Sequence, residues 1–244
     1  MPLVTSDGEI DVPGSLLVVV AHPDDIDFGF AGTVATLTAA GCRVSYCLVT
    51  SGDAGGFDDG IPREEMPLMR EAEQREAAKR VGVSDLHFLR FPDGRVEPSL
   101  ELRKAISRVI RQVRPDVVAC QSPERGWDSV YRSHPDHLAT GEATIRAVYP
   151  DARNPYAFPE LREEEGLEAH TVPEVWVLGL GPARYIDVTE SFGAKVEALR
   201  AHVSQTGHME DLDGRIREWM TNTAADAGFP EGRLAEAHRR IDTA

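Results

Sequence analysis

Hydrophobic residues occur in short continuous runs along this chain, and polar or amphipathic stretches separate the runs. Four of the runs are rich in β-branched side chains, a composition typical of strands that are buried on both faces of a parallel sheet. They predict strands at residues 15–21, 43–50, 85–91 and 116–122.

The stretches between these runs have helix-forming or amphipathic patterns. They predict helices at residues 32–40, 63–81, 100–113 and 136–148. Gly41 and Gly82 follow two of these helices, where a glycine C-cap is common. The alternation of strand and helix implies right-handed crossovers. We therefore predict an α/β fold, a doubly wound, mainly parallel, Rossmann-like sheet with helices on both faces.

The second part of the chain has a less regular pattern. A Pro- and Glu-rich stretch at 150–173 shows no period and predicts an irregular excursion. Further strands are predicted at 174–180 and 184–188, and further helices at 190–204 and 211–225. We divide the chain into a polar leader at 1–14, a single α/β domain at 15–228, and a charged tail or surface helix at 229–244.

Composition restricts the classes of function. The 244 residues fit one large domain, and 41% of them are hydrophobic, as in ordinary globular proteins. The net charge of −15 argues against binding to nucleic acid or to an anionic membrane. No apolar stretch approaches the length of a membrane span, and the acidic leader does not resemble a secretory signal. We expect a cytoplasmic protein.

Two short segments with catalytic residue types each follow a predicted strand. His22-Pro-Asp-Asp25 follows the first strand, and His134-Pro-Asp-His137 lies in the loop after the fourth. The carboxyl ends of parallel strands meet at one edge of a sheet, where ligand crevices form. The fold therefore predicts that the two segments share one site.

These residue types suit a zinc site that leaves one position for water. Two imidazoles and a carboxylate, from His22, Asp25 and His137, would be the ligands. Pro23 stiffens the loop so that His22 and Asp25 can turn to the same side. Asp24 is then free to act as a general base.

The neighbouring residues of the second segment have predicted roles too. A cationic His134 would stabilise an oxyanion, and Asp136 would raise the pKa of His134 by charge pairing. Taken alone, the first segment also fits a helix N-cap with an acid in the first turn, and the second fits a polar surface loop. Their shared position at strand ends favours a metal site.

The paired motifs resemble the PIG-L/LmbE-like family of zinc-dependent N-acetylglucosaminyl deacetylases. The resemblance runs from about residue 15 to about residue 206. Supporting stretches are Thr50-Ser-Gly-Asp53, Arg70 with Glu73, Phe91-Pro-Asp93, Ile186-Asp-Val-Thr189, Lys195 and His202-Val-Ser-Gln205. The resemblance implies an LmbE-type fold.

The resemblance also implies roles for individual residues. His22, Asp25 and His137 match the family's zinc ligands. Asp24 matches the general base, and His134 matches the histidine that stabilises the oxyanion.

Further positions match the family less closely. The resemblance implies that Asp136 orients His134, and that Arg70 and Asp93 hold sugar hydroxyls. Asp27 is a departure, because the family often has Glu at this position; it could bond a ligand histidine or the following loop. Tyr131 lies near the place where some relatives have a tyrosine at the reacting centre.

We therefore predict a hydrolase that removes an acetyl or other acyl group from the amide nitrogen of an N-acetylglucosamine-type sugar. One zinc ion per chain is the expected cofactor, and iron(II) suits the same ligands. The partner is a small amino sugar or glycoconjugate, and the sequence leaves open whether the chain forms a homo-oligomer. An amidase of thiol-sugar conjugates and a deacylase of a glycosylated natural product are the alternatives.

A non-catalytic metal- or sugar-binding module is the alternative from another class. Asp24 and His134 argue against it, because a binding module needs neither. A nucleotide-binding protein is disfavoured because no dinucleotide fingerprint is present.

Residues outside the motifs have mainly structural interpretations. Trp127 fits either a sugar-stacking aromatic or a loop anchor, and His202 fits a packing role as well as a family position. We expect His87 to be a sheet residue, and His170 and His238 to be solvated.

Overall fold

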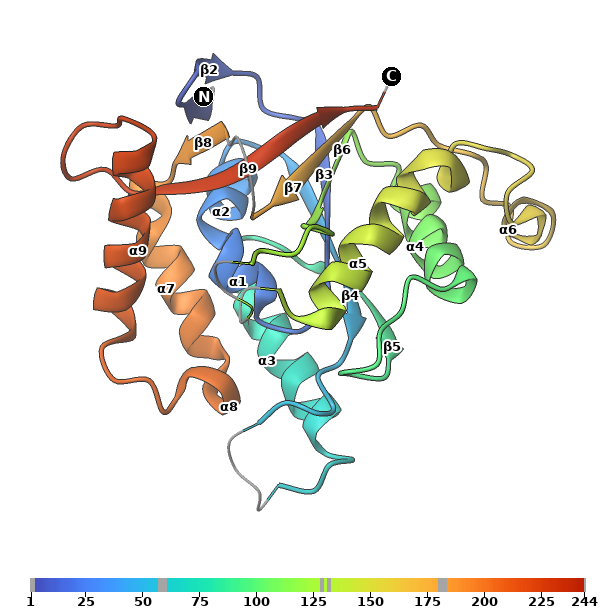
Figure 1. The fold of residues 1–244 in the computed structure, drawn as a ribbon, viewed down its shortest axis with the longest axis horizontal. Coiled ribbons are helices and arrows are strands. Elements are labelled where there is room, and N and C mark those ends of the chain that lie inside the picture. Colours follow the sequence, from blue (N-terminus) through green and yellow to red (C-terminus); the bar gives the residue numbers. More distant parts are fainter. Residues whose placement is uncertain (1–2, 57–60, 128–129, 131–132, 180–183, 244) are drawn as a thin grey trace.

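A single mixed sheet organises the molecule (Figure 1). The computed structural model describes residues 3–56, 61–127, 130, 133–179 and 184–243. Within these residues nine strands follow the order β2-β1-β8-β9-β7-β6-β3-β4-β5. The predicted doubly wound, mainly parallel sheet is confirmed.

The five strands on one side of the sheet are all parallel. They are β3 (Ser15–Val20), β4 (Arg43–Thr50), β5 (Asp85–Phe91), β6 (Val117–Gln121) and β7 (Glu174–Leu178). β3 pairs with β4 on one side and with β6 on the other. Its residues Leu16 to Val20 are fully buried, as expected for a strand that is covered on both faces.

Successive residues of β3 point into two different apolar cores. Leu16 and Val18 belong to the core beneath α2 (Ala31–Ala39), α7 (Phe192–Ala201) and α9 (Leu212–Asp226). Leu17 and Val19 belong to the core beneath α4 (Leu100–Val113) and α5 (Pro135–Arg146). Figure 1 shows these two helix layers on opposite sides of the sheet.

Helices at the carboxyl ends of the strands carry much of the site. α1 (Asp25–Gly29) begins five residues after β3, and α3 (Met66–Arg80) connects β4 to β5. The segment predicted to be irregular contains the last three residues of η2 (Ala147–Ala152) and the whole of α6 (Pro159–Glu163). In the described part of the chain, no helix is both long and apolar enough to cross a bilayer.

The predicted C-terminal tail or surface helix is wrong. Residues Ala235–Asp242 form β9, which runs antiparallel between β7 and β8 (Arg184–Asp187). The charged residues of this segment suggested a solvent-exposed tail. Two of its polar side chains, Glu236 and His238, are instead buried in the interior, as in a strand inside a sheet.

Two further segments differ from their predicted structure. The polar leader contains a hairpin of β1 (Leu3–Thr5) and β2 (Gly8–Ile10), and Thr5 pairs with Ile186 of β8. The single helix predicted at 190–204 is divided into η3 (Thr189–Ser191), α7 and α8 (Val203–Thr206). The break falls at His202, whose φ of −85° and ψ of 61° are not helical.

Candidate metal centre

The two His-Pro-Asp segments meet at the centre of the sheet's carboxyl edge. His22 follows β3, and His134 is the N-cap residue of α5, which comes after β6. The chain order reverses at β3, with β4 and β5 on one side and β6 and β7 on the other. Such a switch point opens a crevice at the carboxyl ends of the strands.

Two imidazole nitrogens and the two oxygens of one carboxylate converge in this crevice. Asp25 Oδ2 lies 3.3 Å from His22 Nδ1, and Asp25 Oδ1 lies 3.0 Å from His137 Nε2. The two imidazole nitrogens, His22 Nδ1 and His137 Nε2, are 3.3 Å apart. Ligand atoms about 2.0–2.1 Å from a tetrahedral zinc ion lie about 3.3 Å from one another. The spacing and the donor types therefore both fit zinc.

The other nitrogen of His22 faces two carboxylates. His22 Nε2 lies 3.0 Å from Asp93 Oδ1 and 3.2 Å from Asp136 Oδ2. Backbone N–H groups of Gly94 and Val96 also donate to the Asp136 carboxylate, at 2.7 and 3.2 Å. Burial disfavours the charged imidazole, but Asp25, Asp136 and Asp93 raise the pKa of His22 to about 12. With this pKa both ring nitrogens of His22 carry protons in the metal-free protein. The two carboxylates hold the Nε2 proton, so Nδ1 is the nitrogen from which a metal ion would displace one.

His134 completes a group of three imidazoles. Its ring centroid lies 5.0 Å from that of His22 and 5.3 Å from that of His137. The Asp136 backbone N–H donates to His134 Nδ1 at 3.2 Å, so a neutral His134 carries its proton on Nε2. Burial, together with the nearby His22 and His137, lowers the pKa of His134.

This geometry corrects two predictions about the second segment. The Asp136 carboxylate turns to His22, and it is the Asp136 backbone that holds His134. The pKa of His134 is lowered, where charge pairing was expected to raise it, because burial outweighs Asp136. His134 is therefore set up as a neutral Nε2–H donor.

Asp24 lies beside the converging donors in an unusual conformation. Its φ of 92° is in the left-handed region that non-glycine residues rarely adopt. Its N–H donates to Gln74 Oε1 at 2.9 Å, and its Oδ2 accepts from Arg70 Nη2 at 3.3 Å. Burial, followed by the adjacent Asp25 charge, raises the pKa of Asp24 to about 7, although Arg70 opposes the shift.

Sequence comparison assigns the family. A family model described as "PIG-L: GlcNAc-PI de-N-acetylase" matches residues 17–148. The chain belongs to the PIG-L family. The predicted family is thus confirmed, and the chain is an enzyme of a de-N-acetylase family.

Three relatives extend the likeness over most of the chain. A diacetylchitobiose deacetylase of Thermococcus kodakarensis is 32% identical over 194 residues, 78% of this chain and 69% of that protein. A probable N-acetyl-alpha-D-glucosaminyl L-malate deacetylase 2 of Bacillus cereus is 35% identical over 208 residues, 83% of this chain and 89% of that protein. The solved N,N'-diacetylchitobiose deacetylase from Pyrococcus horikoshii has a TM-score of 0.83 at 26% identity, covering 94% of this chain and 84% of that one.

Arg70 of this PIG-L chain is enclosed by protein. The side chain is 4% exposed, and Nη2 donates to Pro23 O at 2.7 Å while Nη1 donates to Gly52 O at 3.3 Å. A Cβ at Gly52 would lie 2.3 Å from Arg70 Nη1, so only glycine fits there. The structure thus places Arg70 against Asp24 and backbone carbonyls, and Asp93 against His22. Their contact with sugar hydroxyls stays a prediction.

Asp27 faces away from the candidate ligands. Its Oδ2 accepts from His202 Nε2 and from Gln74 Nε2, both at 2.8 Å, and all three side chains are buried. Asp27 thus bonds helices α3 and α7, and it does not contact a ligand histidine. Sequence reasoning missed Gln74, although it lies four residues after Arg70, on the same face of α3.

The loop before α5 presents an aromatic residue to solvent. Trp127 is 81% exposed, and the Arg125 guanidinium lies 5.9 Å from its ring centroid. The Gly126 N–H donates to Ser133 Oγ at 2.8 Å, which ties this loop to the residue before His134. Tyr131 lies outside the described residues.

Histidines away from the crevice give mixed outcomes. His87 is half-buried in β5, as expected for a sheet residue. The predicted solvation of His170 and His238 is wrong. His170 Nε2 lies 2.8 Å from Pro115 O, and His238 stacks on Trp176 with ring centroids 4.4 Å apart.

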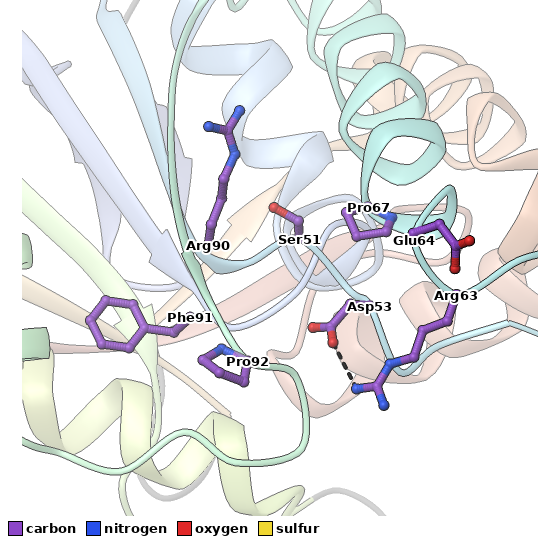
Figure 2. A pocket seen from close by; sticks show the side chains of 8 residues that line it. All are labelled: Ser51, Asp53, Arg63, Glu64, Pro67, Arg90, Phe91 and Pro92. Atoms are coloured by element: carbon purple, nitrogen blue, oxygen red, sulfur yellow. Dashed lines mark hydrogen bonds and ion pairs between the residues drawn. The ribbon is translucent and has the colours of Figure 1, made fainter.

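A cavity of about 520 Å³ adjoins the candidate centre at the ends of β4 and β5 (Figure 2). Asp53 connects the two, because its Oδ1 accepts the Asp93 N–H at 2.8 Å and its Oδ2 accepts from Arg63 at 2.8 Å. Side chains from α3, β5 and the loops after β4 and β5 and before α3 line the cavity: Ser51, Asp53, Arg63, Glu64, Pro67, Arg90, Phe91 and Pro92.

Proposed function

We propose that this PIG-L protein is a zinc-dependent hydrolase that removes the acetyl group from the amide nitrogen of an N-acetylglucosamine-type sugar. The observation that carries the proposal is that His22 Nδ1 and His137 Nε2 lie 3.3 Å apart, while one oxygen of Asp25 lies 3.3 Å from the first nitrogen and the other lies 3.0 Å from the second. Asp24 and His134 border these atoms, and a binding module would need neither.

The residues present fit zinc. His22, Asp25 and His137 would hold the ion, while Asp93 and Asp136 keep the His22 imidazole in the required tautomer. When bound, zinc supplies Lewis-acid polarisation and lowers the pKa of water.

Asp24 has the position and the pKa of a general base. A carboxyl group with a pKa of about 7 can accept a proton from water near neutral pH and return it to the leaving amine. Arg70 fixes the Asp24 carboxylate through the 3.3 Å contact.

His134 would act on the substrate's carbonyl oxygen. The Asp136 N–H occupies His134 Nδ1, so the Nε2–H is available as a donor to the oxygen on which negative charge develops. The neutral imidazole, which the lowered pKa of His134 favours, and the imidazolium both carry this Nε2–H.

The names of the relatives support the substrate class. The two sequence relatives are named for diacetylchitobiose and for N-acetylglucosaminyl malate, which share an N-acetylated glucosamine. Their substituents differ, and this chain's substituent is therefore open to test.

A deacylase of a larger glycoconjugate is the second candidate. The cavity of about 520 Å³ beside Asp93 has room for a group attached to the sugar. A substrate with a bulky aglycone would then have a lower KM than free N-acetylglucosamine.

Amine release from a set of N-acyl sugars tests the proposal. The zinc-loaded protein would be assayed with N-acetylglucosamine, diacetylchitobiose and aryl or thiol conjugates, beside a chelator-treated sample. We expect turnover that depends on zinc and that follows the size of the substituent. Tight sugar binding without any amine release would instead support a binding module.

A further inference from the structure

Asp24 holds its left-handed conformation at a cost. A non-glycine residue in such a region is strained, so surrounding contacts must maintain it. On its carbonyl side, Asp24 O accepts the N–H groups of Asp27 and Phe28 at 2.8 and 3.0 Å, the first bonds of α1. On its amide side, the Asp24 N–H donates to Gln74 Oε1 at 2.9 Å.

The orientation of the Gln74 amide is determined by Asp27. Oδ2 of the Asp27 carboxylate can only accept, so the Gln74 NH₂ group must face it, at 2.8 Å. This leaves Gln74 Oε1 facing the Asp24 N–H. His202 Nε2 donates to the same Asp27 oxygen at 2.8 Å, and Lys195 Nζ donates to Asp27 O at 2.9 Å.

The four side chains that form this network are enclosed. Asp27, Gln74, Lys195 and His202 are each fully buried, so bulk water does not compete for their hydrogen bonds. The network thus connects α7 through Asp27 to α3, and ends at the backbone of Asp24.

We propose that Gln74 is the positioning residue for Asp24, holding its peptide in the strained conformation that directs the carboxylate toward the candidate centre. Asp27 and His202 orient Gln74. The inference rests on the proposed function only in giving Asp24 the role of base; the conformational claim stands on the contacts. Without Gln74, the Asp24 N–H can turn toward the crevice, while Asp25 remains fixed as the first residue of α1.

The first test removes Gln74 Oε1, the acceptor of the Asp24 N–H. It then restores this acceptor in a variant in which the donor and acceptor of the hydrogen bond between positions 74 and 27 are exchanged. Gln74→Met keeps the side chain's length but accepts no hydrogen bond. Gln74→Glu with Asp27→Asn keeps both contacts, since the NH₂ group of the new amide has one hydrogen for the new carboxylate and one for His202 Nε2 in its other tautomer. Ser15→Ala is the control, because it breaks a partly buried 3.0 Å bond to Asp116 at the opposite end of β3.

We expect Gln74→Met to lower kcat by about tenfold or more, the scale of a misplaced catalytic group. KM and zinc content should stay within about twofold of the parent. The double variant should recover most of kcat, and Ser15→Ala should retain it. A Gln74→Met protein with normal kcat, or one whose loss of activity parallels a loss of zinc, would overturn the proposal.

Amide hydrogen exchange of the segment 22–29 provides a readout that needs no turnover. The zinc-loaded Gln74→Met variant should gain one fast-exchanging amide there, and the double variant should regain protection. If the parent deacetylates nothing, the proposed function fails while this measurement still tests the positioning claim. Unchanged exchange would refute it.

Discussion

Asp24 and His137 lie at one site, and replacing each should have a different result. We expect Asp24→Asn to lower kcat by about 10²–10⁴-fold, the contribution typical of a general base, while zinc stays bound. His137→Ala should lose zinc, because it removes one of three ligands. Metal analysis and amine-release kinetics on the same preparations check both results. Full turnover in Asp24→Asn, or full zinc content in His137→Ala, would contradict these assignments.

His238 is a buried imidazole in an apolar environment. Trp176 and Phe30 face its ring, and among the described residues neither ring nitrogen has a hydrogen-bond partner. Burial, then Arg184 and Arg240, lower the pKa of His238 to about 3. The unfolded chain therefore binds a proton below pH 6.5 that the folded chain does not, and acid destabilises the fold.

We expect His238→Phe to stabilise the protein, because it removes two unsatisfied polar atoms and keeps the aromatic ring. The gain over the parent should widen by about 2 kcal/mol between pH 7 and pH 5, since only the parent carries the His238 penalty. Urea unfolding at both pH values measures it. A gain that is independent of pH would show that His238 is not the titrating group.

Single residues of the site were predictable to different degrees. That His22, Asp25 and His137 meet could be predicted from the sequence, because each motif follows a strand and parallel strands end at one edge of the sheet. The partner of the Asp136 carboxylate could not be predicted. His134 and Asp136 lie in one tight turn, and the sequence does not indicate in which direction each side chain points. Gln74 carries no motif at all, and only the fold brings it to Asp24.

At the level of elements, β9 fixes the start of α2. Glu236 accepts the N–H groups of Gly32 and Thr33 at 3.0 and 2.7 Å, and the buried Lys195 Nζ at 2.7 Å. The carboxylate thus satisfies free donors at a helix N-terminus and pairs with a buried ammonium.

We expect Glu236→Ala to cost about 3–5 kcal/mol of unfolding free energy, because it leaves the buried Lys195 charge without its partner. Adding Lys195→Met should recover part of this loss. The exposed Glu231, in the turn before β9, supplies the control Glu231→Ala, which should change little. Denaturant titrations of the three variants measure their free energies of unfolding. Equal losses of unfolding free energy in Glu231→Ala and Glu236→Ala would refute the capping role of Glu236.

The pattern of hydrophobic residues predicted the parallel strands and most of their helices. Continuous apolar runs such as Leu16 to Val20 are distinctive because both of their faces are buried. β9 was not predicted because Glu236 and His238 occupy its buried positions, where apolar residues are expected. Their partners, Lys195 and Trp176, lie far away in the sequence. The break at His202 was missed because its helical neighbours have the ordinary composition of one longer helix.

At the scale of the whole molecule, the proposed cation would stabilise the folded state. Asp24, Asp25, Asp93 and Asp136 gather around the crevice of a protein whose net charge is −15. A divalent ion that binds only the folded state stabilises it by mass action, by about 4 kcal/mol at a thousandfold excess over Kd.

We therefore expect a chelator to lower the Tm by several degrees and added zinc to restore it. The His137→Ala variant, which lacks one proposed ligand, is the control and should show no such response. Differential scanning calorimetry with and without zinc measures the shift. An identical Tm for the chelator-treated and the zinc-loaded parent protein would show that zinc does not stabilise the folded state.

The insertion of β9 between β7 and β8 has a consequence for synthesis on the ribosome. The N-terminus of α2 obtains its carboxylate from a residue about 200 positions further along the chain. Until that residue leaves the exit tunnel, the buried Lys195 lacks its counter-ion and the sheet has a gap in the middle of its antiparallel half. The nascent chain therefore cannot close its sheet before β9 has been translated.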